Sequence, residues 1–493
     1  MKLEQLLEKT EYTCVKGRVN TEITSLVYDS RKVTEGSVFV CISGAVADGH
    51  DYIPEVVKKG AAAVIVEKDV SDQFDITIIR VADTRVALAN MSAAYFGYPA
   101  NEITTIGITG TKGKTTTTYM VRSILEEAGI KTGLIGTIEA IIGEETIPAN
   151  NTTPESYIVQ EYFRKMVDAG CKCVVMEVSS QALKLHRIAG FTFDFGIFTN
   201  IEPDHISPTE HKDFHEYLTC KGKLFRMCKT GIVNIDDAHV WNVLEGHTCQ
   251  VETFGFAKEA DLRAVDVKLH KEGGCLGVSY RTTGLMDFDV KINVPGRFNV
   301  YNSMTAIAIC RHFNIPKETI QSALLNVRVK GRVEPVPISD KFSLMIDYAH
   351  NAMSLESLLT TLREYEPKRL VCLFGCGGNR ARSRRFEMGE ISSKLADLTV
   401  VTSDNPRFEE PQAIMDDIIT GVKKGPGKYV AIIDRKEAIR YCIENAKEGD
   451  LIVLAGKGHE DYQEIKGVKH KMDERDLIRE ILSELKEDGI EVI

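Results

Sequence analysis

Short apolar runs separated by short helical segments recur along this chain. In residues 1–98, the runs Ser37–Ile42 and Ala61–Glu67 are typical of strands set between short helices. The segment Gly97–Glu102 contains glycine and proline, which interrupt both regular structures, so we expect a linker there. We therefore assign residues 1–98 to a first domain.

The next segment, residues 99–332, opens with the β-rich run Thr104–Thr109 and continues into a glycine-rich loop. A helical pattern follows over Tyr119–Ala128, and Gly129 stands where a helix C-cap would. This succession of strand, loop and helix predicts the start of a parallel α/β domain. Further strands are expected at Lys131–Ile138, Cys173–Val178 and Phe193–Asn200.

A third domain, residues 333–493, begins close to two prolines in Lys330–Pro337 that indicate a second linker. Apolar runs alternate there with helical patterns, a rhythm that predicts a doubly wound, Rossmann-like parallel sheet. Its strands are expected at Ser343–Tyr348, Arg369–Gly375, Leu398–Asp404, Tyr429–Asp434 and Leu451–Gly456. The fold class predicted for the whole chain is α/β with three domains.

Composition and charge narrow the function classes. The 493 residues agree with three domains of roughly 150 residues each. The net charge of −10 argues against a nucleic-acid partner, because duplex-binding proteins usually carry a basic excess. The 12 cysteines include no paired zinc-site spacing, which favours reduced, mostly buried thiols. The N-terminus lacks the apolar region of a signal peptide and no run could span a bilayer, so we expect a cytoplasmic protein without a membrane partner.

The strongest chemical signal is the loop Gly110–Thr116, which reads Gly-Thr-Lys-Gly-Lys-Thr-Thr. Backbone N–H groups of such a turn can surround phosphate oxygens, while Lys114 reaches the outer phosphates and Thr115 can ligate Mg²⁺. The usual phosphate loop has a longer spacer before its Gly-Lys pair, and the alternative is a turn with a surface lysine. The strand before the loop and the helix after it favour phosphate binding.

Three further residues stand near predicted strand ends or among basic residues. Glu177 ends a predicted strand, where a carboxylate beside a phosphate loop can bind Mg²⁺; taken alone it would be a solvated acid. His205 and Lys221, judged from their local sequence, are a structural histidine and a surface lysine.

Three polar loops follow strands of the third domain, namely Phe374–Arg385, Ser403–Pro411 and Ala455–Glu460. The alternative for an arginine-rich run is a solvated face. Because the carboxyl ends of parallel strands meet at one edge of a sheet, the three loops predict a ligand site, and the arginines suit a carboxylate or phosphate.

Six motifs, in this order and at these intervals, resemble the Mur ligase family, and within it the tripeptide synthetases of the MurE type. They are GTKGKTT, EVSSQAL, DYAHNAMSLE, FGCGGNR, SDNPR and AGKGHE, with LVYDSR at Leu26–Arg31 in the first domain. The resemblance covers essentially the whole chain. It implies an N-terminal domain for the UDP end of the substrate, a central ATPase domain and a C-terminal Rossmann-like domain.

The resemblance also implies a reaction in cytoplasmic peptidoglycan precursor synthesis, and so a part in cell-wall biogenesis, cell shape and division. ATP, with Mg²⁺, phosphorylates the terminal carboxylate of UDP-N-acetylmuramoyl-L-alanyl-D-glutamate. The amine of meso-diaminopimelate then attacks the acyl phosphate, and ADP and phosphate leave. A carboxylate is a poor electrophile, and cations must neutralise the two anions that approach each other. The family expectation is a monomer acting on small molecules.

Individual roles are implied by the same motifs. Lys114, Glu177, His205 and Lys221 would be catalytic, with Thr115, Glu177 and His205 at Mg²⁺ and Lys221 carbamylated to N6-carboxylysine. A carbamate forms only from a neutral amine, so the pKa of Lys221 should be lowered. The ATP-binding set is Gly110, Thr111, Lys112, Gly113, Lys114, Thr115, Thr116, Asn299, Asn302, Arg332, Asp347 and His350. The UDP-muramoyl set is Ser30, Thr152, Thr153, Ser180 and Arg187, and the amino-acid set is Arg385, Asp404, Asn405, Pro406, Arg407, Gly456 and Glu460.

Arg407 decides the amino acid that we expect. In the family, the DNPR motif occurs in ligases that add meso-diaminopimelate. This amino acid has a distal carboxylate, which an arginine can pair with and which the substrate L-lysine lacks. The chain departs from the family pattern at Lys112, in Asp204–His211, and at Ala352, Ala381 and Arg384–Phe386. The alternatives are therefore a divergent ligase that adds L-lysine or another amino acid, a ligase like folylpolyglutamate synthetase, and a nucleotide-binding regulator without activity. The LVYDSR and DNPR motifs argue against the second, and the complete ATPase set argues against the third.

Overall fold

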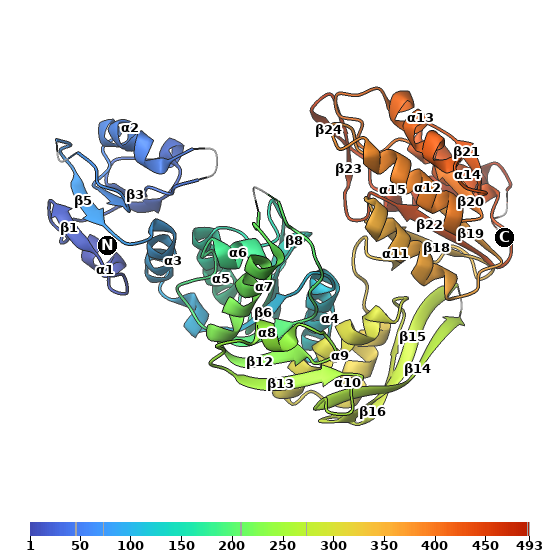
Figure 1. The fold of residues 1–493 in the computed structure, drawn as a ribbon, viewed down its shortest axis with the longest axis horizontal. Helices are drawn as coiled ribbons and strands as arrows, with labels where there is room; N and C mark the ends of the chain where they lie inside the picture. Colours follow the sequence, from blue (N-terminus) through green and yellow to red (C-terminus); the bar gives the residue numbers. More distant parts are fainter. Residues whose placement is uncertain (45–46, 72, 208–209, 273, 491, 493) are drawn as a thin grey trace. The chain divides into compact units, whose positions relative to one another are not determined.

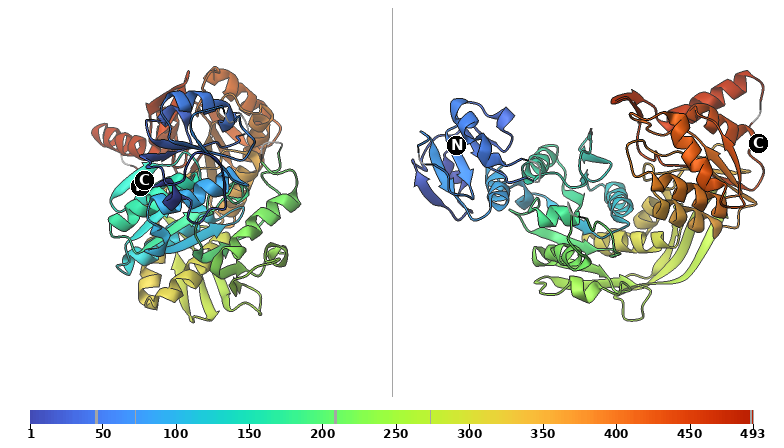
Figure 2. Two further views of the ribbon diagram at one scale, coloured as in Figure 1. Left: turned by 90° about the vertical axis from the view of Figure 1, so that its left-hand side faces the viewer. Right: turned by 45° about the horizontal axis from the view of Figure 1, so that its top comes forward.

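The computed structural model describes residues 1–44, 47–71, 73–207, 210–272, 274–490 and 492. The chain forms two compact units, one of Met1–Arg263 with Met304–Ile315 and the other of Ala264–Ser303 with Pro316–Ile493. Figures 1 and 2 show the course of the chain through both. Each unit is built on twisted β-sheets whose faces are covered by helices.

The N-terminal part of the first unit is a five-stranded sheet in the order β1-β5-β4-β3-β2. Alternate side chains of its strands pack on opposite faces: Val38 and Val40 pack with α1 and α3, whereas Phe39 packs with α2. The strands are β1 (Thr13–Lys16), β2 (Ser25–Val27), β3 (Ser37–Val40), β4 (Ala63–Val66) and β5 (Thr77–Arg80). The helices are α1 (Leu3–Leu6), α2 (Ile53–Lys58) and α3 (Thr84–Tyr95), with 3₁₀ turns η1 (Ser30–Lys32) and η2 (Gly49–Tyr52).

Part of an 11-stranded sheet forms the rest of the first unit, with strands in the order β13-β12-β11-β6-β10-β7-β8-β9. Its strands pair in parallel from β13 to β7, and β8 and β9 are antiparallel. The strands are β6 (Thr104–Thr109), β7 (Thr132–Ile135), β8 (Glu139–Ile142), β9 (Glu145–Pro148), β10 (Cys173–Glu177), β11 (Phe193–Phe198), β12 (Cys228–Asn234) and β13 (Gln250–Gly255). The helices are α4 (Lys114–Glu127), α5 (Ser156–Asp168), α6 (Ser180–Lys184), α7 (Phe214–Gly222) and α8 (Val240–Val243), with η3 (Pro99–Asn101), η4 (Lys223–Arg226) and η5 (Arg311–Phe313).

The second unit contains a six-stranded sheet in the order β17-β18-β22-β19-β20-β21. All its pairs are parallel except β17 with β18, and α11–α13 cover one face while α14 and α15 cover the other (Figure 1). The strands are β17 (Glu334–Pro335), β18 (Ser343–Asp347), β19 (Arg369–Phe374), β20 (Leu398–Val401), β21 (Lys428–Ala431) and β22 (Asp450–Ala455). The helices are α11 (Ala352–Arg363), α12 (Ser383–Leu395), α13 (Pro411–Val422), α14 (Arg435–Glu444) and α15 (Glu474–Glu487). The doubly wound sheet predicted from the sequence is confirmed.

Two smaller features complete the second unit. A hairpin of β23 (Tyr462–Ile465) and β24 (Val468–Lys471) follows the loop after β22. The strands β15 (Cys275–Gly284) and β16 (Phe288–Ile292) pair antiparallel, and β16 packs against α10 (Lys317–Asn326). The strand β14 (Leu262–Glu272) and the helix α9 (Phe298–Cys310) each contain residues of both units.

The expected strands agree with the structure to within a few residues at their ends. The expected linker Gly97–Glu102 contains η3, and Lys330–Pro337 contains the short strand β17. Several strands were not foreseen, among them β12 and β13 of the central sheet and β14, β15 and β16. The cysteines are free and most are buried. Among the described residues, no helix has the length and apolar character required to cross a bilayer.

Candidate functional site

The glycine-rich loop joins β6 to α4, at the carboxyl edge of the central parallel sheet. Gly110 has φ +153°, and a Cβ there would lie 1.9 Å from Thr199 Oγ1, so only glycine fits. Gly113 has φ +84° and precedes the first turn of α4, where backbone N–H groups have no helical acceptor. The Lys114 ammonium donates hydrogen bonds back to the loop, to the carbonyls of Gly110 (2.7 Å) and Thr111 (3.0 Å). This is the strand–loop–helix arrangement that the sequence predicts for an anion site.

Glu177, the last residue of β10, connects the loop to the neighbouring strand ends. Its side chain is 1% exposed and accepts a hydrogen bond from Thr115 Oγ1 at 3.1 Å. It also accepts from the backbone N–H of Thr137 at 2.8 Å and from the Thr137 hydroxyl at 3.0 Å. The hydroxyl of Thr115 and the carboxylate of Glu177 are thus in contact, and both are oxygen donors of the kind Mg²⁺ prefers.

Lys221 lies on α7 and is 1% exposed, which is uncommon for a lysine. Its Nζ donates to the carbonyl oxygen of Gly110 at 2.9 Å and lies 4.4 Å from the centre of the Tyr217 ring. Burial, and secondly the charge of Lys114, lower the pKa of Lys221 well below that of a free lysine. The surface lysine suggested by its local sequence is therefore wrong.

A cavity of about 280 Å³ lies beside the loop and brings residues of several predicted sets together. Those of the predicted sets that line it are Gly110, Lys114, Thr152, Thr153, Ser180, Arg187, His205 and Lys221. Thr153 Oγ1 donates to the backbone carbonyl of Glu177 at 2.8 Å, and Thr152 contacts the Thr137 hydroxyl at 3.1 Å. Two residues predicted to meet ATP, Gly110 and Lys114, therefore share one cavity with four of the five residues predicted to meet the muramoyl substrate.

Several residues of this cavity were not singled out from the sequence. Glu155 lies next to the cavity, and its Oε1 accepts from Nε of the predicted residue Arg187 at 2.8 Å. His211 is fully buried, and its Nε2 lies 2.9 Å from Ser180 Oγ. Asn151, Gln181, Glu210 and Tyr217 also line the cavity. Gln181 falls within the EVSSQAL motif and His211 within the divergent Asp204–His211 stretch. Their positions in these two segments were the sequence signal that could have identified them as cavity residues.

His205 occupies a different environment from the buried residues. It has φ +56°, its side chain is 47% exposed, and its Nδ1 lies 2.9 Å from Glu210 Oε1. Within the same divergent stretch, Pro208 and Thr209 lie outside the described residues. Among the residues that the structure describes, no three His, Cys, Asp or Glu side chains form a ready-made metal cluster. Mg²⁺ commonly binds one or two carboxylates together with water and phosphate oxygens, so a sparse protein donor set suits it.

The remaining predicted residues of the first unit surround the loop or lie in the N-terminal sheet region. The backbone N–H of Lys112 donates to Asn200 Oδ1 at 2.9 Å, and its ammonium lies 2.6 Å from Glu202. Thr116 is buried in the first turn of α4. Ser30 begins η1, and its carbonyl accepts from Lys59 Nζ at 2.8 Å.

The predicted nucleotide contacts of the later segments belong to the second unit. On α9, Asn299 and Asn302 are buried and joined by a 2.8 Å hydrogen bond from Asn302 Nδ2 to Asn299 Oδ1. Asp347 ends β18 and accepts from the N–H groups of Val333 and Ala349, each at 2.8 Å. Burial raises the pKa of Asp347. Arg332 lies over the Tyr348 ring at 5.2 Å, and His350 Nδ1 lies 2.9 Å from the Tyr348 carbonyl.

The loops after β20 and β22 meet in the second unit, as their strand-end positions predict. The carboxylate of Glu460 accepts a 2.9 Å hydrogen bond from Asn405 Nδ2. Arg407, at φ +54°, donates from Nε to Glu464 Oε2 at 3.1 Å and from Nη1 to the Gly378 carbonyl at 3.0 Å. Gly456 has φ +106°, and a Cβ there would lie 3.0 Å from Asp404 Oδ2. Pro406 lies between Asn405 and Arg407 in the same loop.

Arg385 sits deeper than the rest of its predicted set. It is 4% exposed, and its guanidinium pairs with Glu409 at 2.8 Å and with Asp417 at 3.1 Å. Arg382 also binds Asp417, at 2.7 Å. Glu409 and Asp417 already neutralise most of the charge of Arg385, so this arginine has a structural role in supporting the loops. A direct contact with the amino acid stays a prediction.

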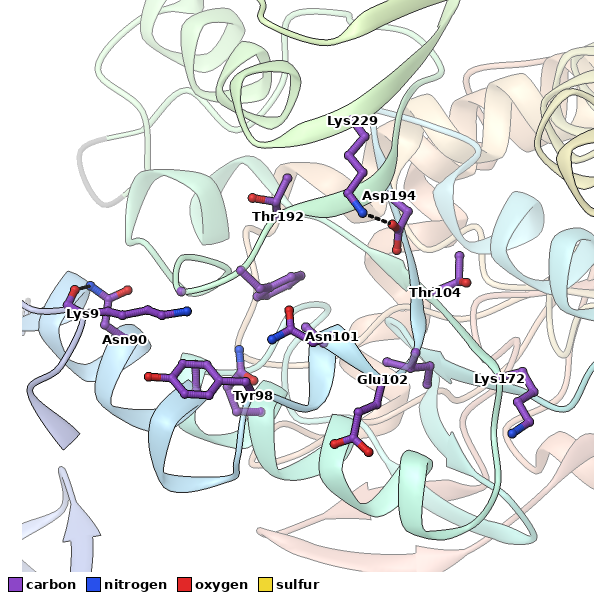
Figure 3. Close-up of a pocket in the computed structure, with 16 residues that line it drawn as sticks. Lys9, Asn90, Tyr98, Asn101, Glu102, Thr104, Lys172, Thr192, Asp194 and Lys229 are labelled. Carbon is purple, nitrogen blue, oxygen red and sulfur yellow. Dashed lines mark hydrogen bonds and ion pairs between the residues drawn. The ribbon is translucent and has the colours of Figure 1, made fainter. Parts of the chain in front are cut away.

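A second cavity, of about 690 Å³, lies at the opposite edge of the central sheet. Its lining includes Thr104, which begins β6, and Lys172 and Thr192, which precede β10 and β11 (Figure 3). Asp194 and Lys229 form a 2.8 Å ion pair in its wall. It holds none of the predicted site residues. Parallel sheets bind ligands at the carboxyl ends of their strands, so the smaller cavity is the candidate active site.

Comparison with known families agrees with this fold, and one of the matching segments includes the glycine-rich loop Gly110–Thr116. Three family models match successive segments: the catalytic domain of the Mur ligase family over residues 22–96, the Mur ligase middle domain over 108–310, and the Mur ligase glutamate ligase domain over 331–458. The chain belongs to the Mur ligase family, with its three-domain architecture. The exact boundaries 98 and 332 stay predictions.

Curated relatives and a solved structure narrow the similarity further. A protein of Clostridium perfringens is 44% identical over 98% of this chain and 99% of its own length, and is named UDP-N-acetylmuramoyl-L-alanyl-D-glutamate--2,6-diaminopimelate ligase. A protein of Caldanaerobacter subterraneus with the same name is 41% identical, over 98% and 99%. A solved structure of a ligase of that name has a TM-score of 0.73 and 25% identity, with 99% of each chain covered.

Proposed function

We propose that this chain joins meso-diaminopimelate to UDP-N-acetylmuramoyl-L-alanyl-D-glutamate in an ATP-dependent amide ligation. The observation that carries the proposal is the end-to-end similarity, at 44% identity, to a protein of that name. The cavity beside the phosphate loop and the Arg407 loop support it. We place the reaction in the cytoplasm, in peptidoglycan precursor synthesis, with a monomeric enzyme that binds small molecules and neither nucleic acid nor membrane.

The first half of the reaction belongs to the loop between β6 and α4. Its backbone N–H groups and Lys114 would hold the ATP phosphates. We assign Asn299, Asn302, Arg332, Asp347 and His350 to the nucleotide as well, on the family motifs in which they stand. Thr115, Glu177 and His205 would hold Mg²⁺, and the Thr115–Glu177 contact at 3.1 Å fits an oxygen-donor site. When bound, the ion neutralises phosphate charge so that the substrate carboxylate can approach. Thr152, Thr153, Ser180 and Arg187, with Ser30, would hold the muramoyl substrate.

Lys221 would act as a carbamate. The Lys221 ammonium first loses one proton to solvent. Its neutral amine then attacks CO₂, a C–N bond forms while one C=O π bond opens, and a second proton leaves to solvent, so that overall a cation becomes an anion. The lowered pKa of Lys221 supports this step, because a larger fraction of the amine is neutral near pH 7. A carbamate anion at this buried position would help to position the Mg²⁺ that Thr115 and Glu177 would hold.

The second half of the reaction belongs to the loops of the C-terminal sheet. Glu460 is suited to the ammonium group of the incoming amino acid, and Arg407 to its distal carboxylate. The test is phosphate release from ATP with the UDP-dipeptide and meso-diaminopimelate, L-lysine or L-ornithine, with product masses. Release that requires diaminopimelate, with the tripeptide mass, is the expected result. Turnover with another amino acid would keep the ligase and reject the role of Arg407; no turnover would reject the proposed activity.

A further inference from the structure

Lys457 is a buried cation that none of the roles above uses. It follows β22 in the AGKGHE segment and is 0% exposed. Its Nζ donates to Asn405 Oδ1 at 2.9 Å, to Glu460 Oε2 at 2.9 Å and to the backbone carbonyl of Tyr462. An ammonium has three donors, so all three are used. Burying a charge is costly unless it is paired in this way, which makes this lysine a fixed part of the loop cluster.

The contacts of Lys457 fix the orientation of the Asn405 amide. Asn405 Oδ1 accepts from Lys457 Nζ and also from the backbone N–H of Glu464 at 2.9 Å. Asn405 Nδ2 donates to Glu460 Oε2 at 2.9 Å. If the amide were turned over, its NH₂ group would face two donors and its oxygen would face a carboxylate. Only one orientation satisfies every group.

The same contacts leave one side of the Glu460 carboxylate open. Lys457 and Asn405 both bind Oε2, whereas Oε1 of Glu460 makes no hydrogen bond with any residue that the structure describes. The Glu460 side chain is 18% exposed, so part of it is open to solvent. Lys457 therefore holds Oε2 of the carboxylate, so that Oε1 is the oxygen left for a ligand.

We propose that Lys457 is a positioning residue of the amino-acid site, which aims Glu460 Oε1 at the ammonium group of the incoming amino acid. This inference rests on the proposed function, since it concerns the same pocket. Lys457 itself need not touch the substrate. Its loss should therefore raise the KM for the amino acid much more than it changes kcat, and should leave the KM for ATP unchanged.

The test compares Lys457→Met with Lys469→Met in the full-length enzyme. Methionine removes the three donors at similar length. Lys469 is a matched control, because it is exposed and lies 4.0 Å from the Tyr462 ring, which Lys457 also approaches at 5.2 Å. Hydrogen bonds to charged groups correspond to about 10- to 100-fold in affinity, so we expect an increase of that size in the amino-acid KM of Lys457→Met. Lys469→Met should stay within about twofold of the wild type.

A second comparison separates positioning from a merely structural role. In a Glu460→Gln background, the Lys457→Met change should raise the amino-acid KM by less than about threefold, because the carboxylate that it positions is gone. If Lys457→Met fails to fold, Lys457→Gln, which keeps one donor, takes its place. An unchanged amino-acid KM, or an equal loss in the ATP KM, would overturn the inference. The acceptor is whichever amino acid the wild type uses, so failure of the diaminopimelate assignment is seen separately, in the wild type.

Discussion

The guanidinium of Arg407 is already paired with a carboxylate of the protein, since its Nε lies 3.1 Å from Glu464 Oε2. Glu464 belongs to the β23–β24 hairpin, and both side chains are about one-quarter exposed. An incoming distal carboxylate would have to share this arginine with Glu464. If Arg407 binds that carboxylate as proposed, the hairpin would take part in setting how strongly the site attracts it.

We expect Glu464→Gln to strengthen the use of diaminopimelate. The amide keeps a hydrogen-bond acceptor for Arg407 but removes the negative charge that competes with the substrate. The KM for diaminopimelate should fall by about three- to tenfold, a size appropriate to a partly exposed pair. The KM for L-lysine, which has no second carboxylate, should not fall. Steady-state kinetics with both acceptors is the measurement, with the exposed Asp461→Asn as a control of equal charge. A rise in the diaminopimelate KM would mean that Glu464 helps to hold the substrate instead.

Arg407→Asn should have the opposite and larger effect. Removing one partner of a partly buried charge pair and the proposed contact with the distal carboxylate should lower kcat/KM for diaminopimelate by about 100-fold. The KM for ATP should change by less than about twofold, because Arg407 is assigned to the other substrate. The Arg407→Asn/Glu464→Gln double variant controls for the acid left without its partner. Unchanged kcat/KM for diaminopimelate would remove Arg407 from the amino-acid site.

The elements that the sequence predicts well are those whose signal is local. The run Thr104–Thr109 forms β6, and Gly129, at φ +75°, follows α4 where a C-cap glycine is expected. The strand ends then place Glu177 and the DNPR loop, because parallel strands bring their carboxyl ends to one edge. The strand β14 and the antiparallel pair β15–β16 were not foreseen; along β14 buried positions alternate with partly exposed ones for only a few residues.

The parts of the site that escaped prediction depend on distant partners. Lys221 contacts a carbonyl 111 positions away, and from its own basic neighbourhood it reads as a surface lysine. Lys457 gains its environment from Asn405, 52 positions earlier in the chain. No local pattern of apolar and polar residues distinguishes either from an exposed lysine. The resemblance to the family implied a role for Lys221, but it implied none for Lys457.

Asp417→Asn should destabilise the C-terminal domain in a pH-dependent way. Hydrogen bonds from Arg382, and secondly from Arg385, hold the pKa of Asp417 below its usual value. The stability that Asp417 contributes is therefore present above the carboxyl pKa of the unfolded chain and is lost as the pH falls through the lower folded value. The free energy of unfolding at pH 7 should fall by about 1–3 kcal/mol, because the buried Arg385 loses one of its two acidic partners.

Urea unfolding at several pH values measures this effect. The difference between the wild type and Asp417→Asn should shrink below a pH of about 4. Asp416→Asn is a matched control, since Asp416 is the exposed neighbour on α13 and accepts from Gln412. A difference that stays constant down to low pH would show that the loss comes from packing and not from the charge of Asp417.

Lys221→Met should abolish most of the turnover without unfolding the protein. Methionine matches the length of lysine and suits a buried position, but it cannot form a carbamate, and we expect kcat to fall by at least about 100-fold. Lys223→Met is the control, because that lysine lies two positions along the chain and, among the described residues, donates a 3.4 Å hydrogen bond to the Leu183 carbonyl.

The carbamate on Lys221 is tested by removing and restoring CO₂. Wild-type enzyme held in CO₂-depleted buffer should lose activity and regain it with bicarbonate, more slowly as the pH is lowered, because protonation removes the neutral amine. Lys221→Met should show no response to bicarbonate. Equal activity of the wild type with and without CO₂, together with a Lys221→Met variant that is still inactive, would assign Lys221 a role as an ammonium ion.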